Sequence, residues 1–287
     1  MAVVRNVRRG RIHARPGEIA FLWVSRGIIW LIIVAALIPM LYVVTASFNP
    51  TQSFFSASLI PPHPSFYNYQ QVFKSNYFLW LRNSTLVAVI VAAGQLGMTS
   101  TAAYAFSRMR FLGRGSGLKT LIILQMFPNS MAIAAIYAVL AQMQLLNHLW
   151  VYILLLMGGS AFSIWLMKGY YDSIPRELDE SAFMDGASHF QVFWKVVLPL
   201  ARPMLAVIFF LNMIGIYSEY ILASTVLQSN SKFTIGLGMY SLIDGGYSAN
   251  WGEFAAAALL TAIPLTIIFA ILNPIMAKGL IAGALKG

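Results

Sequence analysis

The 287-residue sequence contains no cysteine and only nine acidic residues, against 19 lysines and arginines. The missing cysteine excludes a disulfide framework and a thiolate metal site. Only 10% of the residues are charged, whereas soluble proteins approach one quarter, and 59% are hydrophobic. The charges occur in clusters between long apolar runs. Most of this chain is therefore predicted to lie in lipid rather than in water.

The apolar runs are long enough to form six membrane spans, since a helix needs about 20 apolar residues to cross a core of about 30 Å. Two spans are predicted at 27–48 and 83–107. The 48 uncharged residues at 120–167 suit two further spans, with a turn near 142–150. The fifth and sixth are predicted at 203–226 and 254–277. We therefore expect an all-α integral membrane protein with six transmembrane helices.

The basic residues orient this bundle. With the N-terminus inside, 16 of the 19 lysines and arginines fall in cytoplasmic segments, which is the positive-inside pattern. They recur beside apolar segments and form no single face, which argues against nucleic acid as a partner. Both termini are predicted to be cytoplasmic. The predicted divisions are a tail at 1–26, a six-span domain at 27–277 with a cytoplasmic loop at 168–202, and a tail at 278–287.

Five of the nine acidic residues lie within fourteen residues of this loop: Asp172, Glu177, Asp179, Glu180 and Asp185. A helix of about eleven residues is predicted here, with Ser173 as N-cap, Pro175 in its first turn and Gly186 at its end. The sequence predicts an apolar side made by Leu178, Ala182 and Phe183, with Glu177, Asp179 and Glu180 staying polar. So short a helix is marginal in water, so we expect it to dock on its own bundle or in a partner's groove.

A second helix is predicted directly after the glycine. Ser188 and Gln191 have the spacing of a capping box. Four apolar residues then follow helical spacing and predict one face along the membrane surface: Phe190, Phe193, Trp194 and Val197.

The spacing across both helices resembles a known loop. Glu180-Ser181-Ala182, three residues, Gly186, nine residues, Val196, one residue and Leu198-Pro199 closely resembles the EAA loop of ABC importer permeases. Ser181 and Val196 are mild departures from alanine and isoleucine. "TAAYAFSRMRF", "MFPNSMAIAAIY" and "GLIAGALKG" resemble the maltose-type carbohydrate permeases, specifically the smaller six-span subunit. The likeness is clear from about Arg82 onward.

The resemblance implies a permease subunit of an ATP-driven importer in a bacterial cell membrane. Its EAA loop between spans four and five would be a coupling helix that docks in a cytoplasmic ATPase, through Glu180, Ser181, Ala182, Phe183, Asp185, Gly186, Leu198 and Pro199. The C-terminal Leu285, Lys286 and Gly287 would touch the ATPase pair, or form a frayed terminus. The implied partners are a second permease, a homodimeric ATPase and an extracytoplasmic sugar-binding protein. The chain itself would carry no cofactor, and ATP and Mg would bind the ATPase.

The residues themselves argue against an enzyme. "GRGSGLKT" has Leu118 where a phosphate-binding loop needs glycine before its lysine, and no strand is predicted before it. The four histidines lie outside the apolar runs, so intramembrane metal or nucleophile chemistry lacks its usual groups. An ion-coupled secondary transporter would need a coupling-ion site, and only one acidic residue falls within a span. By resemblance the cargo is maltose or maltodextrin, with acidic (uronide) oligosaccharides as the alternative.

That one acidic residue is Glu219, flanked by Tyr217 and Tyr220. It is predicted either to line or gate the sugar pathway, or to make an interfacial contact or an interhelical hydrogen bond. The outer segment 228–253 is predicted either to contact a partner or to be an ordinary surface loop. Pro39, Pro128 and Pro264 are expected to kink their spans.

Overall fold

The computed structural model describes residues 16–50, 61, 63–126, 129–158, 161–245 and 249–284, and within these ranges every regular element is helical. The α-helices are α1 (Pro16–Ser47), α2 (Tyr67–Lys74), α3 (Tyr77–Arg108), α4 (Arg114–Gln125), α5 (Ile133–Gln142), α6 (Leu149–Met157), α7 (Ala161–Asp172), α8 (Glu177–Met184), α9 (His189–Val192), α10 (Leu198–Leu200), α11 (Arg202–Ser218), α12 (Ile221–Val226), α13 (Ile235–Ile243) and α14 (Trp251–Ala284). Short 3-10 turns lie at Asn129–Ala132 and Asn230–Lys232, and a π-helical turn lies at Phe193–Val197.

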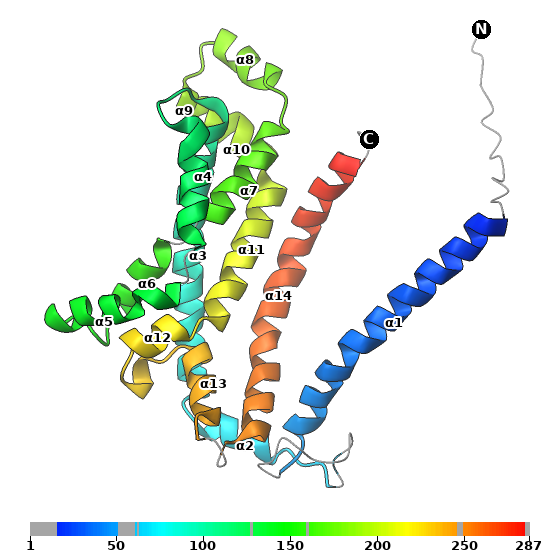
Figure 1. Cartoon of the computed structure of the whole chain (residues 1–287), viewed down its shortest axis with the longest axis vertical. Helices are drawn as coiled ribbons and strands as arrows, with labels where there is room; N and C mark the ends of the chain where they lie inside the picture. Colours follow the sequence, from blue (N-terminus) through cyan, green and yellow to red (C-terminus); the bar gives the residue numbers. More distant parts are fainter. Residues whose placement is uncertain are drawn as a thin grey trace.

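Helix α3 is the central element of the bundle. It packs against α7, α11, α6 and α13, and α11 in turn packs against α14. Figure 1 shows α8 and α9 at one end of the long axis and α2 and α13 at the other. Helix α1 leans away from the bundle and packs against α14, so most of its apolar side chains are exposed. These exposed side chains suit contact with lipid or with another membrane subunit.

Among the described residues, three single helices are long and apolar enough to cross a membrane: Leu22–Ser47, Tyr77–Arg108 and Trp251–Ala277. Two bent pairs raise the number to five, if each pair is one span. Leu149–Met157 and Ala161–Asp172 meet at 47°, and His189–Leu200 and Arg202–Ser218 meet at 78°. The helices of the first, second and sixth predicted spans start eleven, six and three residues earlier than predicted, and the sixth also ends seven residues later. The helices continue past the charged residues that flank the apolar runs.

The predicted third span is not one continuous helix. Its apolar run forms α4, which ends at Gln125, then the 3-10 turn Asn129–Ala132 and the ten-residue apolar helix Ile133–Gln142. Ten residues span only about 15 Å, roughly half of a bilayer core. The predicted turn after this run is confirmed, with Gln144 and Asn147 at positive φ between α5 and α6. Pro39 and Pro264 lie inside α1 and α14, whereas Pro128 is outside the described residues.

The outer segment 228–253 is more than a loop. It contains the Asn230–Lys232 turn and α13, whose Ile235 and Leu237 are buried. The side-chain amide of Asn83 donates to the carbonyls of Ser231 and Phe233 at 3.1 and 3.0 Å. A Cβ on Gly238 would lie 2.3 Å from the Trp80 ring, so only glycine permits this close packing of α13 on α3. The surface-loop alternative is therefore wrong for the described part of this segment.

Two apolar clusters stabilise the bundle. One joins α3, α6, α11 and α13 around Trp80, Tyr152 and Met213. The other lies nearer α8 and α9 and joins α3, α7 and the residues that follow α8, around Tyr104 and Met167. The second cluster includes buried residues of the segment 168–202, so this segment is packed against α3 and α7.

Candidate functional site

The segment 168–202 forms the end of the molecule where α8 lies. Helix α8 packs against α9 and the π-helical turn, and Figure 1 shows it beyond the ends of the long helices. It has eight residues, Glu177–Met184, rather than the predicted eleven. Ser173 is not its N-cap, because α7 runs on to Asp172 and the Ser173 hydroxyl instead donates to the Tyr170 carbonyl at 2.7 Å.

Helix α8 presents apolar side chains to its surroundings. Leu178 is 44% exposed, Phe183 37% and Met184 88%. The Phe183 ring meets His189 edge to face at 4.8 Å, which holds α8 against the start of α9. Glu177, Glu180 and Ser181 are exposed, whereas Ala182 is half-buried. Part of each of these three apolar side chains stays uncovered by the described part of the chain.

Asp179 is buried, so the prediction that it stays on the polar side is wrong. Its Oδ2 lies 2.6 Å from Nε of Arg108, and these two side chains are 7% and 5% exposed. Arg108 also donates from Nη2 to the carbonyl of Ile174 at 2.9 Å. A buried charge is costly unless it is paired, so this ion pair sets where α8 sits relative to the end of α3.

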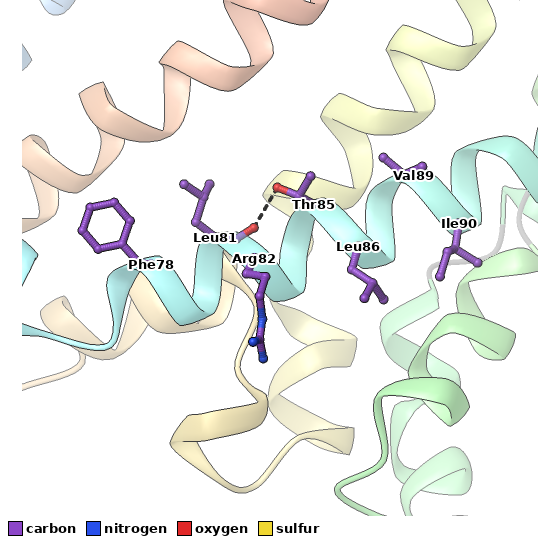
Figure 2. Close-up of a pocket in the computed structure, with 7 residues that line it drawn as sticks. All are labelled: Phe78, Leu81, Arg82, Thr85, Leu86, Val89 and Ile90. Atoms are coloured by element: carbon purple, nitrogen blue, oxygen red, sulfur yellow. Dashed lines mark hydrogen bonds between the residues drawn. The ribbon is translucent and has the colours of Figure 1, made fainter.

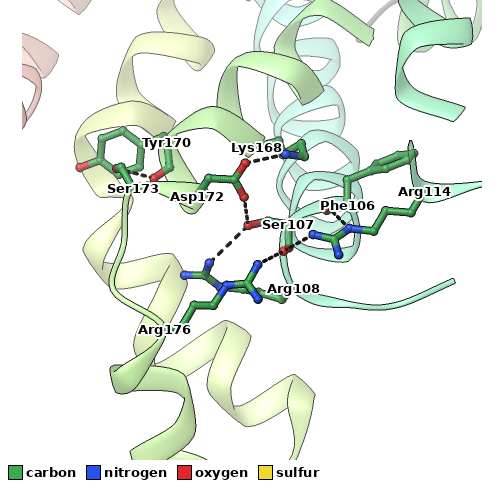
Figure 3. A network of polar contacts seen from close by, with 9 residues as sticks. All are labelled: Phe106, Ser107, Arg108, Arg114, Lys168, Tyr170, Asp172, Ser173 and Arg176. Carbon is green, nitrogen blue, oxygen red and sulfur yellow. Dashed lines mark hydrogen bonds and ion pairs between the residues drawn. The ribbon is translucent and has the colours of Figure 1, made fainter. Parts of the chain in front are cut away.

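A polar network lies around Arg108 of this ion pair (Figure 3). The Ser107 hydroxyl donates to Asp172 Oδ1 at 2.6 Å, and Lys168 pairs with the other carboxylate oxygen. Arg114 donates to the carbonyls of Phe106 and Ser107, both at 2.9 Å, and Arg176 also reaches Ser107. These bonds tie the end of α3 to α7, to the start of α4 and to the approach to α8. The sequence does place basic residues near the acidic cluster, but it does not predict which acidic residue pairs with which basic one.

Gly186 ends α8 as predicted. Its φ is +85°, in the left-handed region, and its amide donates to the Phe183 carbonyl at 3.0 Å. The chain then turns, and Ser188 and Gln191 form the predicted capping box.

The predicted apolar face of the second helix is only half correct. Phe193 and Val197 are buried, whereas Phe190 and Trp194 are exposed and stack on each other at 6.4 Å. The π-helical turn at Phe193–Val197 widens the helix there, so regular α-helical spacing does not hold.

The eight residues predicted to couple to an ATPase do not share one surface. Glu180, Ser181, Ala182, Phe183, Asp185 and Gly186 lie on α8 and its end. Leu198 and Pro199 lie in α10, partly buried at the base of α11, where Leu198 packs against the second apolar cluster. Leu285, Lys286 and Gly287 are outside the described residues.

Glu219 lies inside the predicted fifth span, 203–226, at the point where the observed helix stops. Helix α11 ends at Ser218, and Glu219 is extended. Its carboxylate accepts the backbone N–H groups of Leu222 at 2.6 Å and Ala223 at 3.1 Å, and the Tyr152 hydroxyl at 2.6 Å. The carboxylate thus starts α12 and joins α6, which is the predicted interhelical hydrogen bond. Helix α11 therefore stops eight residues before the predicted end of the span at 226, and the chain becomes helical again in α12.

The two flanking tyrosines point to different places. Tyr217 is buried, and its hydroxyl lies 2.6 Å from Oγ1 of Thr85 on α3. Tyr220 is 38% exposed and stacks on Tyr240 with ring centroids 4.9 Å apart. The three residues therefore do not line one space, and the pathway role of Glu219, Tyr217 and Tyr220 stays a prediction.

An open groove of about 590 Å³ runs along α3 (Figure 2). Its lining residues are Phe78, Leu81, Arg82, Thr85, Leu86, Val89 and Ile90. Arg82 is the one charged residue among them, and Thr85 connects the groove to Tyr217. From the sequence, Arg82 was counted only as a basic residue on the outer side. The groove could not be predicted, because it depends on which neighbouring helices leave this face of α3 uncovered.

The described residues contain no group of three or more His, Asp or Glu side chains that could hold a metal ion. The α8 end therefore combines exposed apolar side chains, a buried ion pair and a polar network.

Comparisons with known proteins identify the family to which this chain belongs. The family model of the binding-protein-dependent transport system inner membrane component matches residues 19–281. The galactooligosaccharides transport system permease protein GanQ of Bacillus subtilis (strain 168) is 39% identical over 254 residues, 87% of this chain and 90% of its own length. The maltose/maltodextrin transport system permease protein MalG of Escherichia coli (strain K12) is 35% identical over 288 residues, 93% of this chain and 97% of its own length.

Among solved structures, a chain from a bacterial ABC transporter involved in the import of the acidic polysaccharide alginate has a similar fold. Its TM-score is 0.72 at 23% identity, and the match covers 91% of this chain and 98% of that one. Because the family model spans most of the sequence and two relatives share more than a third of the aligned residues, the chain belongs to the family of binding-protein-dependent transport system inner membrane components, as a multi-pass permease subunit of an ABC importer.

Proposed function

We propose that this chain is one of two permease subunits of an ATP-driven oligosaccharide importer, with six spans and both termini on the cytoplasmic side. Segment 168–202 is its coupling segment between spans four and five. The cargo is maltodextrin or a related neutral oligosaccharide, as named for the relatives at 35–39% identity. The permease is non-catalytic, and ATP and Mg bind a homodimeric ATPase on the cytoplasmic side. An extracytoplasmic sugar-binding protein delivers the sugar at the outer segment 228–253.

The exposed apolar residues of α8 are the observation that carries this proposal. An eight-residue helix is too short to be stable alone, and Leu178, Phe183 and Met184 are exposed at the very end of the bundle. Such a ridge suits insertion into a cleft of a partner. Movement of α8 would pass through Asp179 to Arg108 and so to α3. The ATPase drives transport only because it has a different affinity for the inward-facing and outward-facing permease.

An acidic oligosaccharide is the second candidate cargo. Arg82 is favourable for it, since it is the one cation among the residues lining the groove on α3. Competition between maltooligosaccharides and uronide oligosaccharides in a transport assay separates the two. Inhibition by the uronide alone would overturn the neutral cargo.

Site-directed crosslinking tests the coupling role directly. The chain has no cysteine, so Phe183→Cys introduces its one thiol. We expect a thiol-reactive crosslinker at this position to capture the ATPase subunit in active membranes, with a yield that changes when ATP is added. Leu112→Cys is the matched control, because Leu112 is fully exposed in the connection between α3 and α4. Equal capture from both positions, or none from residue 183, would contradict the docking of α8.

The C-terminal Leu285, Lys286 and Gly287 are proposed to contact the ATPase pair, and Glu219, with Tyr217 and Tyr220, to border the sugar pathway. For Glu219 the pathway role and the hydrogen-bonding role are separable. Tyr152→Phe removes the hydroxyl that donates to the carboxylate, whereas Glu219→Gln removes the charge. Each is expected to cost about 1–3 kcal/mol of stability, and Glu219→Gln is expected to lower the transport rate further at equal stability.

The measurement is sugar uptake plotted against the melting temperature of the purified complex for both variants. If uptake falls only in proportion to stability in both, Glu219 has a structural role and its place in the pathway is refuted.

A further inference from the structure

A second cavity, of about 880 Å³, lies between α4, α7 and the start of α11. Its charged lining residues are Arg114, Lys119, Lys168 and Asp172, and its apolar lining includes Leu118, Ile122, Leu166 and Met204. Trp165 and Tyr170 complete the wall. The cavity thus combines cations with an apolar surface, at the same end of the bundle as α8 (Figure 1).

The charges are not balanced within the cavity. Asp172 is occupied by Ser107 and Lys168 (Figure 3). Lys119 is exposed and makes no hydrogen bond or ion pair with any residue that the structure describes. Arg114 uses Nε and Nη2 for backbone carbonyls and keeps its positive charge. The cavity therefore has an excess of positive charge, and a bound anion would offset it.

The outermost lining residues are polar and the deepest are apolar. Arg114 lies in the first turn of α4, and Asp172 is the last residue of α7. Ile122 lies about 12 Å beyond Arg114 along α4, and Trp165 lies about two turns before Asp172 along α7, with Lys119 and Lys168 between these levels. Trp165 is 51% exposed, as is usual for tryptophan at a membrane interface. A ligand that fits this order has an anionic head and an apolar tail.

We propose that this cavity binds one anionic phospholipid, with the phosphate beside Lys119 and Arg114 and an acyl chain along Leu118, Ile122 and Trp165. Basic pockets between membrane helices on the cytoplasmic side are suited to such head groups. A neutral sugar does not need these cations, and the one carboxylate that lines the cavity is already occupied. The site is independent of the transported cargo.

Lipid retention tests this site. The purified importer complex is reconstituted in nanodiscs containing equal amounts of phosphatidylglycerol and phosphatidylcholine, extracted into mild detergent, and its retained lipids are quantified by mass spectrometry. The wild-type complex is expected to retain phosphatidylglycerol preferentially. Lys119→Gln is expected to lower the ratio of the two retained lipids about fivefold, since one basic residue near a membrane surface contributes about 1 kcal/mol. Arg110→Gln is the control, because Arg110 is an exposed basic residue in the connection before α4 that does not line the cavity.

Three outcomes would overturn the proposal. An equal ratio of retained phosphatidylglycerol to phosphatidylcholine in the wild type and in Lys119→Gln would show that the cavity does not select the lipid. Displacement of the retained phosphatidylglycerol by inorganic phosphate would show that a free anion is the ligand. Loss of the second permease from the Lys119→Gln complex would show that a partner side chain occupies the cavity. Sugar-stimulated ATPase activity, measured on the same samples, reports separately on the proposed transport function.

Discussion

Asp179→Ala is expected to abolish sugar-stimulated ATPase activity and uptake, although the protein still inserts into the membrane. The change leaves the guanidinium of Arg108 buried without its ion-pair partner, 2.6 Å away in the native chain. Breaking one side of a buried pair costs about 3–5 kcal/mol. Since α9 and the π-helical turn are the main packing partners of α8 among the described elements, this cost falls on the position of α8. Arg108→Ala should have the same effect, because it leaves the carboxylate of Asp179 buried without its ion-pair partner.

A charge-exchange variant gives this prediction its control. The exchanged pair Arg108→Asp with Asp179→Arg restores opposite charges and is expected to recover part of the activity and thermal stability lost in the single variants. Lys168→Gln breaks a more exposed pair, with side chains 27% and 39% exposed, and should cost at most about 1 kcal/mol. If the two single variants and the exchanged pair were all as active as the wild type, Asp179 would not transmit the movement of α8.

Gly186→Val is expected to reduce uptake to background while the complex remains assembled. Gly186 has φ +85°, and a β-branched residue is a strong outlier there. The strain amounts to about 1–3 kcal/mol, and the chain relieves it by changing the turn that aims α8. The readouts are uptake, sugar-stimulated ATPase activity and the amount of ATPase that co-purifies.

Gly113→Val is a closely matched control. Gly113 has φ +86° before α4, and a Cβ at either glycine would meet no atom within 4 Å. Both substitutions therefore introduce similar backbone strain without a clash, but only residue 186 lies in the turn after α8. Comparable losses of uptake in the two variants would attribute the effect to general strain and remove the support for coupling through this turn.

Local patterns were sufficient for much of the segment 168–202. The positive φ of Gly186 and the Ser188–Gln191 capping box depend on residues within one or two turns, so the sequence identifies them. The length of α8 was predicted less well, because the Ser173 hydroxyl donates to the Tyr170 carbonyl of α7 and does not cap α8. The face of the second helix was also misjudged, since a π-helical turn breaks the regular spacing at Phe193.

The spans show the same division between local and long-range effects. Long apolar runs identify α1, α3 and α14 because hydrocarbon excludes charge regardless of the neighbouring helices. The break between α4 and α5 and the end of α11 at Ser218 were missed. At Glu219 the carboxylate binds the backbone of α12 and the hydroxyl of Tyr152, 67 residues away. Hydropathy averages along the chain and contains no such partner.

The sequence by itself determined that the chain lies in a membrane, where its charges gather and which loop carries the EAA spacing. These properties follow from the free energy of transferring each residue into lipid and from contacts within a few residues. Only the tertiary structure decided that Asp179 pairs with Arg108, that Tyr217 turns inward, and that a basic cavity forms between α4 and α7. Those outcomes depend on which side chains meet across helices, because a buried charge is tolerated only where the fold supplies its partner.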